Sequence, residues 1–515
     1  MRENLEHVRW RLDLKVALLL AVFSAFLLFL SFPHPGLRGL IWVALVPLYL
    51  ALRGQGWLRG ALIGLVSGFC YWCSLLYWAT FFGVPALVAL VLWKCSGPVL
   101  LGLTLGPVRF RRAWQAAAYG ALAYTAMEWF QMLGPLGATW GMLSHSQARA
   151  LLWIQCTDLV GPWGLSFLIA LVNSVLAEWL MVASRAGRAR ATRQLRGAFA
   201  ATAGLAALVL GYGAFRLAHP ITSDAPPVTF GAVQVSMSRD TKWNRDFADE
   251  TLAQLDRLSR EAAAAGARII VWPETSIPYR NFLLNPNLTY AVGTLARSTG
   301  SWLIVGSIEF SGEKTTYNTA SLVTPTGRIA DRYDKQRLVP GGEYLPLGRY
   351  LRHHPIFDRV MNFVPGKDGG NFRAGDLNVG VLVCYESMVP YLPRHRVDNG
   401  AQVILVSTND GWFGRSSAAA HHFEMAIMAA VEVRRPVVQA GNTGISGVID
   451  PMGRVHSESR LDERTVVTGS VVPLDYISLY VRIGEACAWL CAALWAVGLL
   501  IGVKGNLESL ANPLK

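Results

Sequence analysis

Long apolar runs dominate the first 218 residues of the chain and return near its C-terminus, at 485–503. Most of these runs approach the length of about 20 residues that an α-helix needs to cross a bilayer. We therefore predict a polytopic α-helical membrane bundle of about eight transmembrane helices. The first seven are predicted at 14–32, 37–52, 60–82, 84–106, 113–133, 160–184 and 196–217.

Between residues 219 and 482 the pattern changes to short apolar runs separated by turn residues. Runs of this kind are typical of buried strands, and we predict strands at 228–235, 267–274, 301–310, 378–386, 401–408 and 465–472. Two further segments, 321–333 and 446–458, resemble each other, and each is predicted to form a strand, a Pro-x-Gly turn and a second strand. Two longer segments, 245–265 and 418–434, have the apolar spacing of helices. Buried strands that alternate with helices predict an α/β domain whose sheets are covered by helices.

Three domains follow from this change of pattern. They are an N-terminal transmembrane bundle at 1–218, an α/β domain at 219–482, and a C-terminal transmembrane helix with its tail at 483–515. The first run resembles a signal peptide, because Arg9, Arg11 and Lys15 precede it. We interpret it as a membrane span, since "SFPHPG" follows in place of a small-residue cleavage site and further spans come after it.

Composition agrees with a membrane protein. The 515 residues are 52% hydrophobic and include 18 Trp, and the mean hydropathy is +0.33. The net charge of +13 comes with no stripe of Lys or Arg interleaved with aromatic residues in the α/β domain, so we expect no nucleic-acid partner.

The distribution of basic residues orients the predicted bundle. The short outer loops carry Arg38 and Arg149, whereas the inner segments are rich in basic residues, which places both termini in the cytoplasm and the α/β domain outside. The inner basic residues are Arg2, Arg9, Arg11, Lys15, Arg53, Arg59, Arg109, Arg111, Arg112, Arg185, Arg188, Arg190, Arg193, Arg196, Lys504 and Lys515.

Four ionisable residues, Lys94, Glu128, Asp158 and Glu178, lie inside or at the edges of predicted spans. Charged groups are costly in a bilayer, so each is either a functional or helix-pairing residue or a side chain that reaches the interface from a span end. A transporter would use such residues, which leaves transport open as a function at this point.

Cysteine usage draws attention to Cys384. The other six cysteines lie in the apolar runs, and Cys70-x-x-Cys73 is interpreted as packing within a span. Cys384 is the single cysteine of a domain predicted to face an oxidising compartment, so it is either a small buried core residue or a thiol that is used.

Two other polar residues occupy places like that of Cys384, close to the end of a predicted strand. Glu274 follows "IIVW", and Lys335 stands between a strand and a Gly-Gly turn. A thiol with an ordinary pKa near 8.5 needs a base or a positive neighbour to act as a nucleophile, and Glu274 with Lys335 supplies both. Taken without Cys384, the two residues would be read as a simple ion pair.

The segments "WPE" (272–274), "YDKQRLVPGGEYLP" (333–346) and "GVLVCYES" (380–387) resemble the active-site segments of the nitrilase, or carbon-nitrogen hydrolase, superfamily. A domain of this type between seven N-terminal spans and one C-terminal span is similar to the membrane-embedded apolipoprotein N-acyltransferase family, over essentially the whole chain. The resemblance implies an extracytoplasmic nitrilase-like αββα sandwich.

The resemblance also implies roles for single residues. Cys384 matches the nucleophile, Glu274 the general base and Lys335 the cation that stabilises the tetrahedral intermediate. The other matching positions are Glu343 beside the triad, Tyr385 and Glu386 after the nucleophile, with the Tyr385 backbone N–H as a second oxyanion donor, and Trp243 and Trp412 in the substrate site.

The implied reaction transfers an acyl chain from a membrane phospholipid to the N-terminal α-amine of S-diacylglyceryl-cysteine apolipoproteins, by a ping-pong mechanism through a cysteine thioester. The implied location is the bacterial inner membrane, with the catalytic domain in the periplasm. Two alternatives are a membrane-tethered amidase, which would pass the acyl group to water, and a transporter with an accessory domain.

No cofactor or metal is expected. The pairs His353, His354 and His421, His422 lack metal-ligand spacing, and no phosphate-binding Gly loop links a strand to a helix. Segments 280–288 and 344–366 mix apolar and basic residues, so they either dip into the headgroup layer or pack on the domain core.

Overall fold

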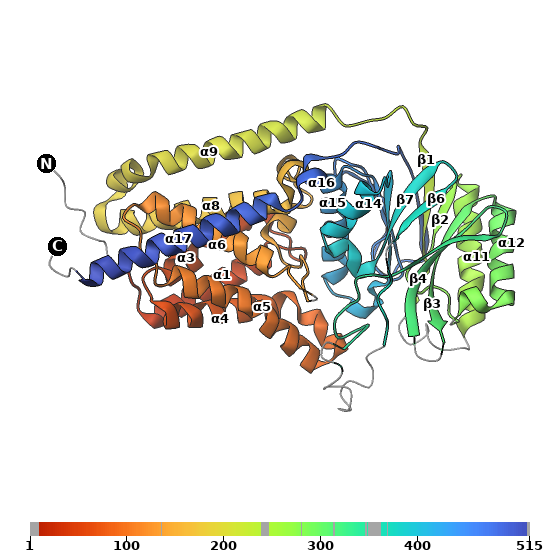
Figure 1. Cartoon of the computed structure of the whole chain (residues 1–515), viewed down its shortest axis with the longest axis horizontal. Coiled ribbons are helices and arrows are strands. Elements are labelled where there is room, and N and C mark those ends of the chain that lie inside the picture. Colours follow the sequence, from red (N-terminus) through yellow and green to blue (C-terminus); the bar gives the residue numbers. More distant parts are fainter. Residues whose placement is uncertain are drawn as a thin grey trace. The chain divides into compact units, whose positions relative to one another are not determined.

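The computed structural model describes residues 10–134, 136–237, 247–279, 281–312, 315–345, 348, 362–367 and 369–511. The chain separates into two compact units, one formed by Met1–Phe215 with Ile483–Lys515 and the other by Arg216–Arg482. The first unit is helical, and the second contains all the strands of the described part of the chain (Figure 1).

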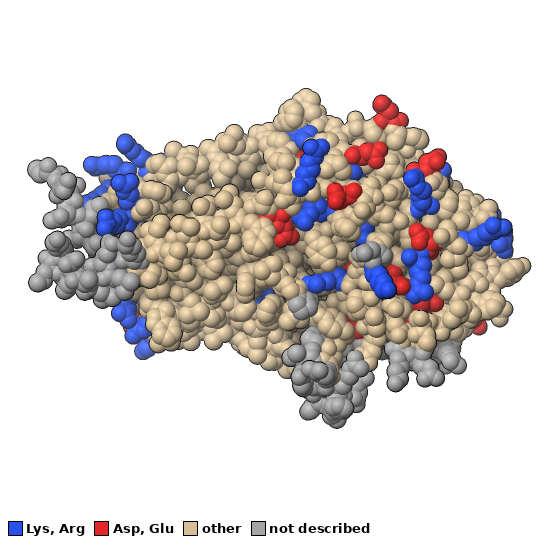
Figure 2. All heavy atoms as spheres, in the orientation of Figure 1, with Lys and Arg blue, Asp and Glu red and all other residues tan. Residues whose placement is uncertain are grey.

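Apolar helices make up the first unit. Five helices in the described residues are long and apolar enough to cross a membrane, while Leu14–Leu30 and Arg38–Leu52 are apolar but shorter. Figure 2 shows few charged residues on the visible face of this unit, apart from Lys and Arg gathered at one end. Its elements are α1 (Leu14–Leu30), η1 (Arg38–Leu40), α2 (Ile41–Ala44), α3 (Val46–Leu52), α4 (Trp57–Leu75), η2 (Tyr77–Phe82), α5 (Val84–Leu105), α6 (Ala113–Phe130), η3 (Leu143–Gln147), α7 (Leu151–Ile154), α8 (Thr157–Ala186), α9 (Arg188–Ala218) and α17 (Ala486–Ala511).

The predicted helix at 37–52 is not continuous. It divides into η1, α2 and α3, because Pro47 lacks the N–H that would continue the helical ladder across Leu45. The buried side chain of Asn173 in α8 satisfies the interrupted backbone: its Oδ1 accepts from Leu45 N at 2.8 Å, and its Nδ2 donates to Ile41 O at 2.9 Å. The predicted helical N-terminal region with several apolar helices is confirmed, and the number of helices that span a membrane stays a prediction.

Glycines bring α4 and α5 into backbone contact. A Cβ added at Gly64 would lie 2.0 Å from Pro98 O, and one added at Gly102 would lie 2.0 Å from Gly60 O. Small residues are favoured at such interfaces in membranes because they allow helices to approach closely. The two helices are thus held by a contact that any side chain at these positions would disturb.

The four ionisable residues of the predicted spans all have polar contacts inside the helical unit. These contacts join separate segments of the unit, which suits residues that pair helices. They are Lys94 Nζ to Ala138 O at 2.9 Å, Leu143 N to Glu128 Oε1 at 2.8 Å, Tyr212 OH to both oxygens of Asp158 at 2.9 and 2.8 Å, and Arg53 Nε to Glu178 Oε1 at 3.2 Å.

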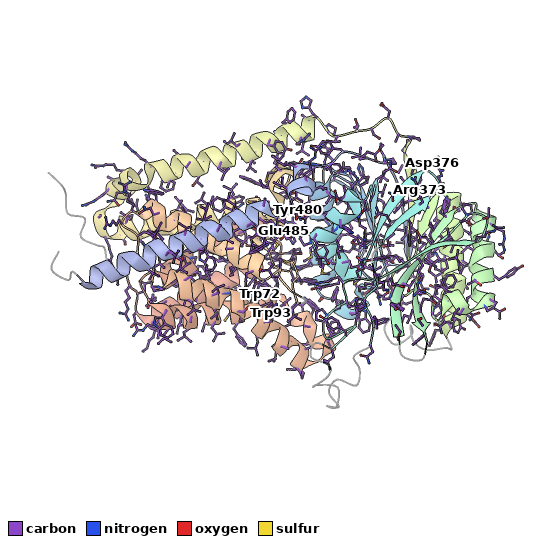
Figure 3. The ribbon with its side chains drawn as sticks, in the orientation of Figure 1. Trp72, Trp93, Arg373, Asp376, Tyr480 and Glu485 are labelled. Atoms are coloured by element: carbon purple, nitrogen blue, oxygen red, sulfur yellow. The ribbon has the colours of Figure 1, made fainter. Side chains whose placement is uncertain are left out.

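Two further contacts involve residues labelled in Figure 3. Lys94 Nζ lies 5.0 Å from the centre of the Trp72 ring, a cation–π distance. Just before α17, Glu485 Oε2 accepts a hydrogen bond from Trp129 Nε1 at 2.8 Å. The second contact fastens the C-terminal helix to α6.

The second unit contains two six-stranded sheets, each with a parallel centre and antiparallel edges. The first has the order β12 (Thr465–Val471), β1 (Val228–Gln234), β2 (Ile269–Val271), β3 (Trp302–Ser311), β4 (Thr315–Val323), β5 (Ile329–Asp334). The second has the order β11 (Val455–Glu458), β10 (Gly447–Ile449), β9 (Val437–Gly441), β8 (Val403–Thr408), β7 (Leu377–Val383), β6 (Asn371–Ala374).

Helices cover the outer face of each sheet (Figure 1). One buried apolar cluster, which includes Phe230 and Val381, joins the two sheets. A second, which includes Leu255 and Leu295, packs α11 (Ala248–Ala264) and α12 (Pro286–Thr299) on the first sheet, while α14 (Tyr391–Asp398) and α15 (Ala418–Val433) lie on the other side. The predicted α/β domain is confirmed as a layered αββα arrangement.

Several details differ from the pattern-based prediction. β6 and β9, and the helices α12 and α14, were not among the predicted elements, whereas the two predicted strand–turn–strand segments are present as β4 with β5 and as β10 with β11. Residue 280 lies outside the described residues; within 281–288, Phe282 and Leu288 pack on the domain core, whereas Leu284 is exposed. Of segment 344–366, residues 346, 347 and 349–361 lie outside the described residues.

Candidate active site

Polar side chains gather where the central parallel strands of both sheets end. Glu274 follows β2, Cys384 follows β7 and Asp410 follows β8. Carboxyl ends of parallel strands are where α/β proteins present functional groups. The two sheets are tied together at this edge, because Ser407 Oγ donates to Trp272 O at 2.9 Å.

Cys384 is the first residue after β7. We predicted that the strand would run to Glu386, but it ends at Val383, because Cys384 has a left-handed φ of 52° and begins the short helix η7 (Cys384–Met388). Its side chain is buried. Burial raises the pKa of the thiol well above its ordinary value, the negative charge of Glu274 raises it further, and Lys335 opposes both. The resting thiol is therefore protonated.

Glu274 is buried and held by three donors. Its Oε1 accepts from Lys335 Nζ at 3.1 Å and from Asn318 Nδ2 at 2.7 Å, and its Oε2 accepts from Asn409 N at 3.1 Å. Pro273 precedes it and cannot donate to a ladder, which suits the end of β2. The carboxylate is fixed in place beside the thiol whose pKa it raises.

Lys335 follows β5 and is only 1% exposed. Its Nζ also lies 3.0 Å from Glu343 Oε1 and from Glu343 Oε2. Burial alone lowers the pKa of the ammonium, but the negative charges of Glu274 and Glu343 together with the coupling to Cys384 outweigh it, so the pKa is raised well above its ordinary value. Lys335 is a fixed positive charge.

Glu343 and Asn318 complete this cluster. Glu343 Oε2 accepts from Val339 N at 2.8 Å, and Oε1 accepts from Asn318 Nδ2 at 2.8 Å. Burial raises the pKa of Glu343, although Lys335 opposes the rise. Asn318, on β4, was missed by sequence reasoning; its single amide donates to both carboxylates and so keeps them together without a second positive charge.

Glu386 is fully buried and connects the Cys384 segment to the Lys335 segment. Its Oε1 accepts from Tyr333 OH at 2.7 Å, Gln336 N at 2.7 Å and Arg337 N at 3.0 Å, and its Oε2 accepts from Val383 N at 2.8 Å. A carboxylate with four donors is a rigid junction. It fixes where Lys335 stands relative to the end of β7.

The remaining predicted residues have separate positions. Tyr385 is half-buried, and burial raises the pKa of its hydroxyl above the ordinary value. Trp412 is half-buried in η8 (Asp410–Phe413). Trp243 lies outside the described residues.

A buried chain of polar side chains reaches Cys384 from its other side. Asp410 Oδ1 lies 2.8 Å from His422 Nδ1, and His422 Nε2 lies 2.8 Å from Ser387 Oγ, which donates to Cys384 O at 2.9 Å. Thr408 Oγ1 donates to the same Asp410 oxygen at 3.0 Å. Sequence reasoning missed this chain, because His422 was considered only as a metal ligand and no spacing along the sequence relates it to Ser387.

Two family models match the chain. The carbon-nitrogen hydrolase model matches residues 230–479, which covers the αββα domain and the cluster around Cys384. The model of the apolipoprotein N-acyltransferase N-terminal domain matches residues 24–175, within the helical unit.

Relatives match along nearly the whole chain. The apolipoprotein N-acyltransferase of Geobacter metallireducens is 34% identical over 494 residues, which are 92% of this chain and 93% of that protein. That of Gloeobacter violaceus is 29% identical over 500 residues, covering 92% and 91%. Among solved structures, an amidase from Nesterenkonia sp. is 19% identical and aligns with 52% of this chain and 96% of its own, with a TM-score of 0.39.

Proposed function

The chain belongs to the apolipoprotein N-acyltransferase family, and from this membership we propose that it moves an acyl chain from a membrane phospholipid to the N-terminal α-amine of S-diacylglyceryl-cysteine apolipoproteins. The chain acts as an acyltransferase, and the acyl group is carried as a thioester on Cys384. The single observation that supports this route best is the buried cluster in which Lys335 Nζ lies 3.1 Å from Glu274 and 3.0 Å from Glu343, coupled to the Cys384 thiol.

The first half-reaction acylates the enzyme. Because the thiol is protonated at rest, Glu274 takes its proton as the sulfur attacks the ester carbonyl of the phospholipid. The negative charge that develops on the carbonyl oxygen is stabilised by Lys335 and by the Tyr385 backbone N–H. When the intermediate collapses, the C–O bond breaks, Glu274 returns the proton to the leaving oxygen, and a lysophospholipid departs.

The second half-reaction uses the same groups to move the acyl chain from Cys384 to the acceptor amine. The α-amine of the acceptor attacks the thioester carbonyl, Glu274 accepts a proton from the nitrogen, and Lys335 again faces the oxyanion. Breaking the C–S bond leaves Cys384 as a thiolate, which is reprotonated by Glu274. The product is an amide, so transfer to the amine is favoured over return to the lipid.

Cluster members outside the triad have supporting roles in this proposal. Glu343 balances the charge of Lys335, and Asn318 bridges the carboxylates of Glu274 and Glu343 and so keeps them together. Tyr385 supplies one oxyanion donor through its backbone N–H, Glu386 holds the Lys335 segment against the Cys384 segment, and Trp243 and Trp412 match positions that line the family's substrate site. Both substrates carry acyl chains, which gives the apolar helices a reason to be part of the enzyme.

A coupled transfer assay tests the function. The purified full-length chain is given a phospholipid with an isotope-labelled acyl chain and a peptide that begins with S-diacylglyceryl cysteine. We expect labelled N-acyl peptide and an equal amount of lysophospholipid. A peptide whose amine is acetylated should gain no label. Labelled free fatty acid in place of N-acyl peptide would instead show that the acyl group passes to water, as the tethered-hydrolase alternative requires.

The proposal places the chain in a bacterial inner membrane as a multi-pass protein, with the α/β domain in the periplasm. The support is the basic asymmetry of the predicted loops. A reporter that is active only outside the cytoplasm should give signal when fused near Ser223 and none when fused near Arg190. The reverse pattern would show that the α/β domain lies in the cytoplasm.

A further inference from the structure

Asp410 is the anchor of two hydrogen-bonded branches that end on Cys384. One branch runs through Thr408, whose hydroxyl donates to Asp410 Oδ1 at 3.0 Å and is in hydrogen-bonding contact with the Cys384 thiol. The other runs through His422 and Ser387 to the Cys384 carbonyl oxygen. The thiol and the carbonyl of one residue are therefore tied to one carboxylate oxygen.

All members of both branches are shielded from solvent. Thr408 and His422 are fully buried, Asp410 is 1% exposed and Ser387 is 5% exposed. In such surroundings a hydrogen bond is electrostatically stronger than in water, and each bond in a chain polarises the next. A serine hydroxyl often donates to the backbone carbonyl three residues earlier in turns. Here the Ser387 hydroxyl also forms a hydrogen bond with the buried imidazole of His422.

The carbonyl that Ser387 contacts belongs to the peptide group that also carries the Tyr385 N–H. In a planar trans peptide the C=O and the following N–H point in opposite directions, so fixing one fixes the other. Cys384 has a left-handed φ of 52°, which is uncommon for a residue with a side chain, and the Ser387 hydroxyl contacts the carbonyl of the peptide that follows it. The hydrogen bond from Ser387 also withdraws electrons from the carbonyl oxygen of this peptide group, which makes the Tyr385 N–H a stronger donor.

We propose that Ser387, His422 and Asp410 form a positioning relay that aims and polarises the Tyr385 backbone N–H as an oxyanion donor. The inference rests on the proposed acyl transfer through Cys384, and it adds three residues that act on the reaction through the peptide group. None of the three contacts the reacting carbonyl.

Two reactions of the same sulfur test the relay in the full-length chain. Acylation of Cys384 by phospholipid passes through an oxyanion, whereas alkylation by iodoacetamide displaces iodide from a saturated carbon and forms none. Both are followed on the Cys384 peptide by mass spectrometry. For Ser387→Ala we expect acylation slower by about tenfold or more, since oxyanion donors are typically worth more than that, with unchanged alkylation.

Three further variants sharpen the test. Ser387→Thr keeps the hydroxyl and should restore most of the acylation rate, and Asp410→Asn should slow acylation while the protein stays folded. Ser301→Ala is the matched control, because Ser301 is also buried and donates to a backbone carbonyl, Ala267 O at 2.8 Å, away from the relay. It should leave both reactions unchanged.

The outcomes separate this inference from the proposed function. Wild-type acylation rates in Ser387→Ala and Asp410→Asn, or an equal fall of acylation and alkylation in both, would overturn the relay. If wild-type protein forms no acyl adduct on Cys384 at all, the proposed function fails before the relay is tested.

Discussion

Lys335 Nζ lies 3.1 Å from Glu274 Oε1, with the Lys335 side chain 1% and the Glu274 side chain 5% exposed. Removing one partner of a buried pair leaves the other charge uncompensated, which is more costly than losing the attraction alone. Glu343 is a second carboxyl group on the same ammonium, so two carboxyl groups share one cation beside the thiol. The chemistry of Cys384 therefore depends on the geometry of the cluster as well as on its charge.

The charge-conserving change Lys335→Arg should lower the rate of Cys384 acylation by about a hundredfold or more, the range seen when an oxyanion donor is lost. Arginine keeps the charge, but its planar fork cannot replace a compact ammonium shared by two carboxylates. Lys367→Arg is the control, because Lys367 is exposed. Normal acylation by the Lys335 variant would make that lysine an ion-pair partner without a role in the reaction.

Asn318→Asp should be more damaging than Asn318→Ala. The alanine variant loses the donor shared by Glu274 and Glu343, and we expect acylation to fall by about tenfold, since hydrogen bonds to charged groups contribute about 1.5 to 3 kcal/mol. The aspartate variant also places a third carboxylate where the amide lies 2.7 and 2.8 Å from two others. Acylation rates of the two variants, measured side by side, decide the order; equal rates would contradict it.

Glu274→Gln should change acylation and alkylation of Cys384 in opposite directions. The negative charge of Glu274 helps to raise the pKa of the thiol, so its removal lowers that pKa and increases the thiolate fraction at any pH below it. The pH profile of iodoacetamide alkylation should shift to lower pH, while acylation by phospholipid is lost with the general base. A profile that is unmoved, or moved to higher pH, would show that Glu274 does not act on the thiol.

Gly64→Ala should destabilise the helical unit, because the new Cβ would lie 2.0 Å from the Pro98 carbonyl oxygen and the backbones of α4 and α5 would have to separate. Overpacking of this kind typically costs about 1 to 3 kcal/mol. The matched control is Gly204→Ala in α9, where a Cβ meets nothing within 4 Å. Thermal unfolding in detergent should show a lower midpoint for the first variant only; equal midpoints would mean that the α4–α5 contact is not tight.

Sequence patterns predicted those parts of the fold that depend on length and hydrophobicity. Apolar runs near the span of a bilayer indicated the helical region, but they could not show that the ladder breaks before Pro47 and is repaired by Asn173, a residue far away in the sequence. The missed strands are short: β6 has four residues and β9 has five, too few for a periodic pattern to be detected. Longer strands, such as β1 and β3, were found with their ends shifted by a residue or two.

The residues of the candidate site also form two groups: those that the sequence predicted and those that only the structure reveals. Glu274, Lys335 and Cys384 each stand in a segment that resembles a known family, so they could be named from the sequence. Asn318 lies in the interior of β4 and His422 in the interior of α15, and neither segment carries a distinguishing motif. Their roles arise from the sheet register and helix packing that bring them to the others, which the sequence alone does not display.

A covalent intermediate on Cys384 is the central claim, and its direct measurement is the mass of the protein after incubation with phospholipid and no acceptor. A ping-pong enzyme must hold the acyl group between donor and acceptor. We expect wild-type protein to gain the mass of one acyl chain, located by digestion on Cys384 and released by neutral hydroxylamine, and Cys384→Ala to gain none. Adding the diacylglyceryl-cysteine peptide should then move the chain onto the free amine of the peptide. An adduct on another residue, or discharge to water that the peptide does not intercept, would contradict the claim.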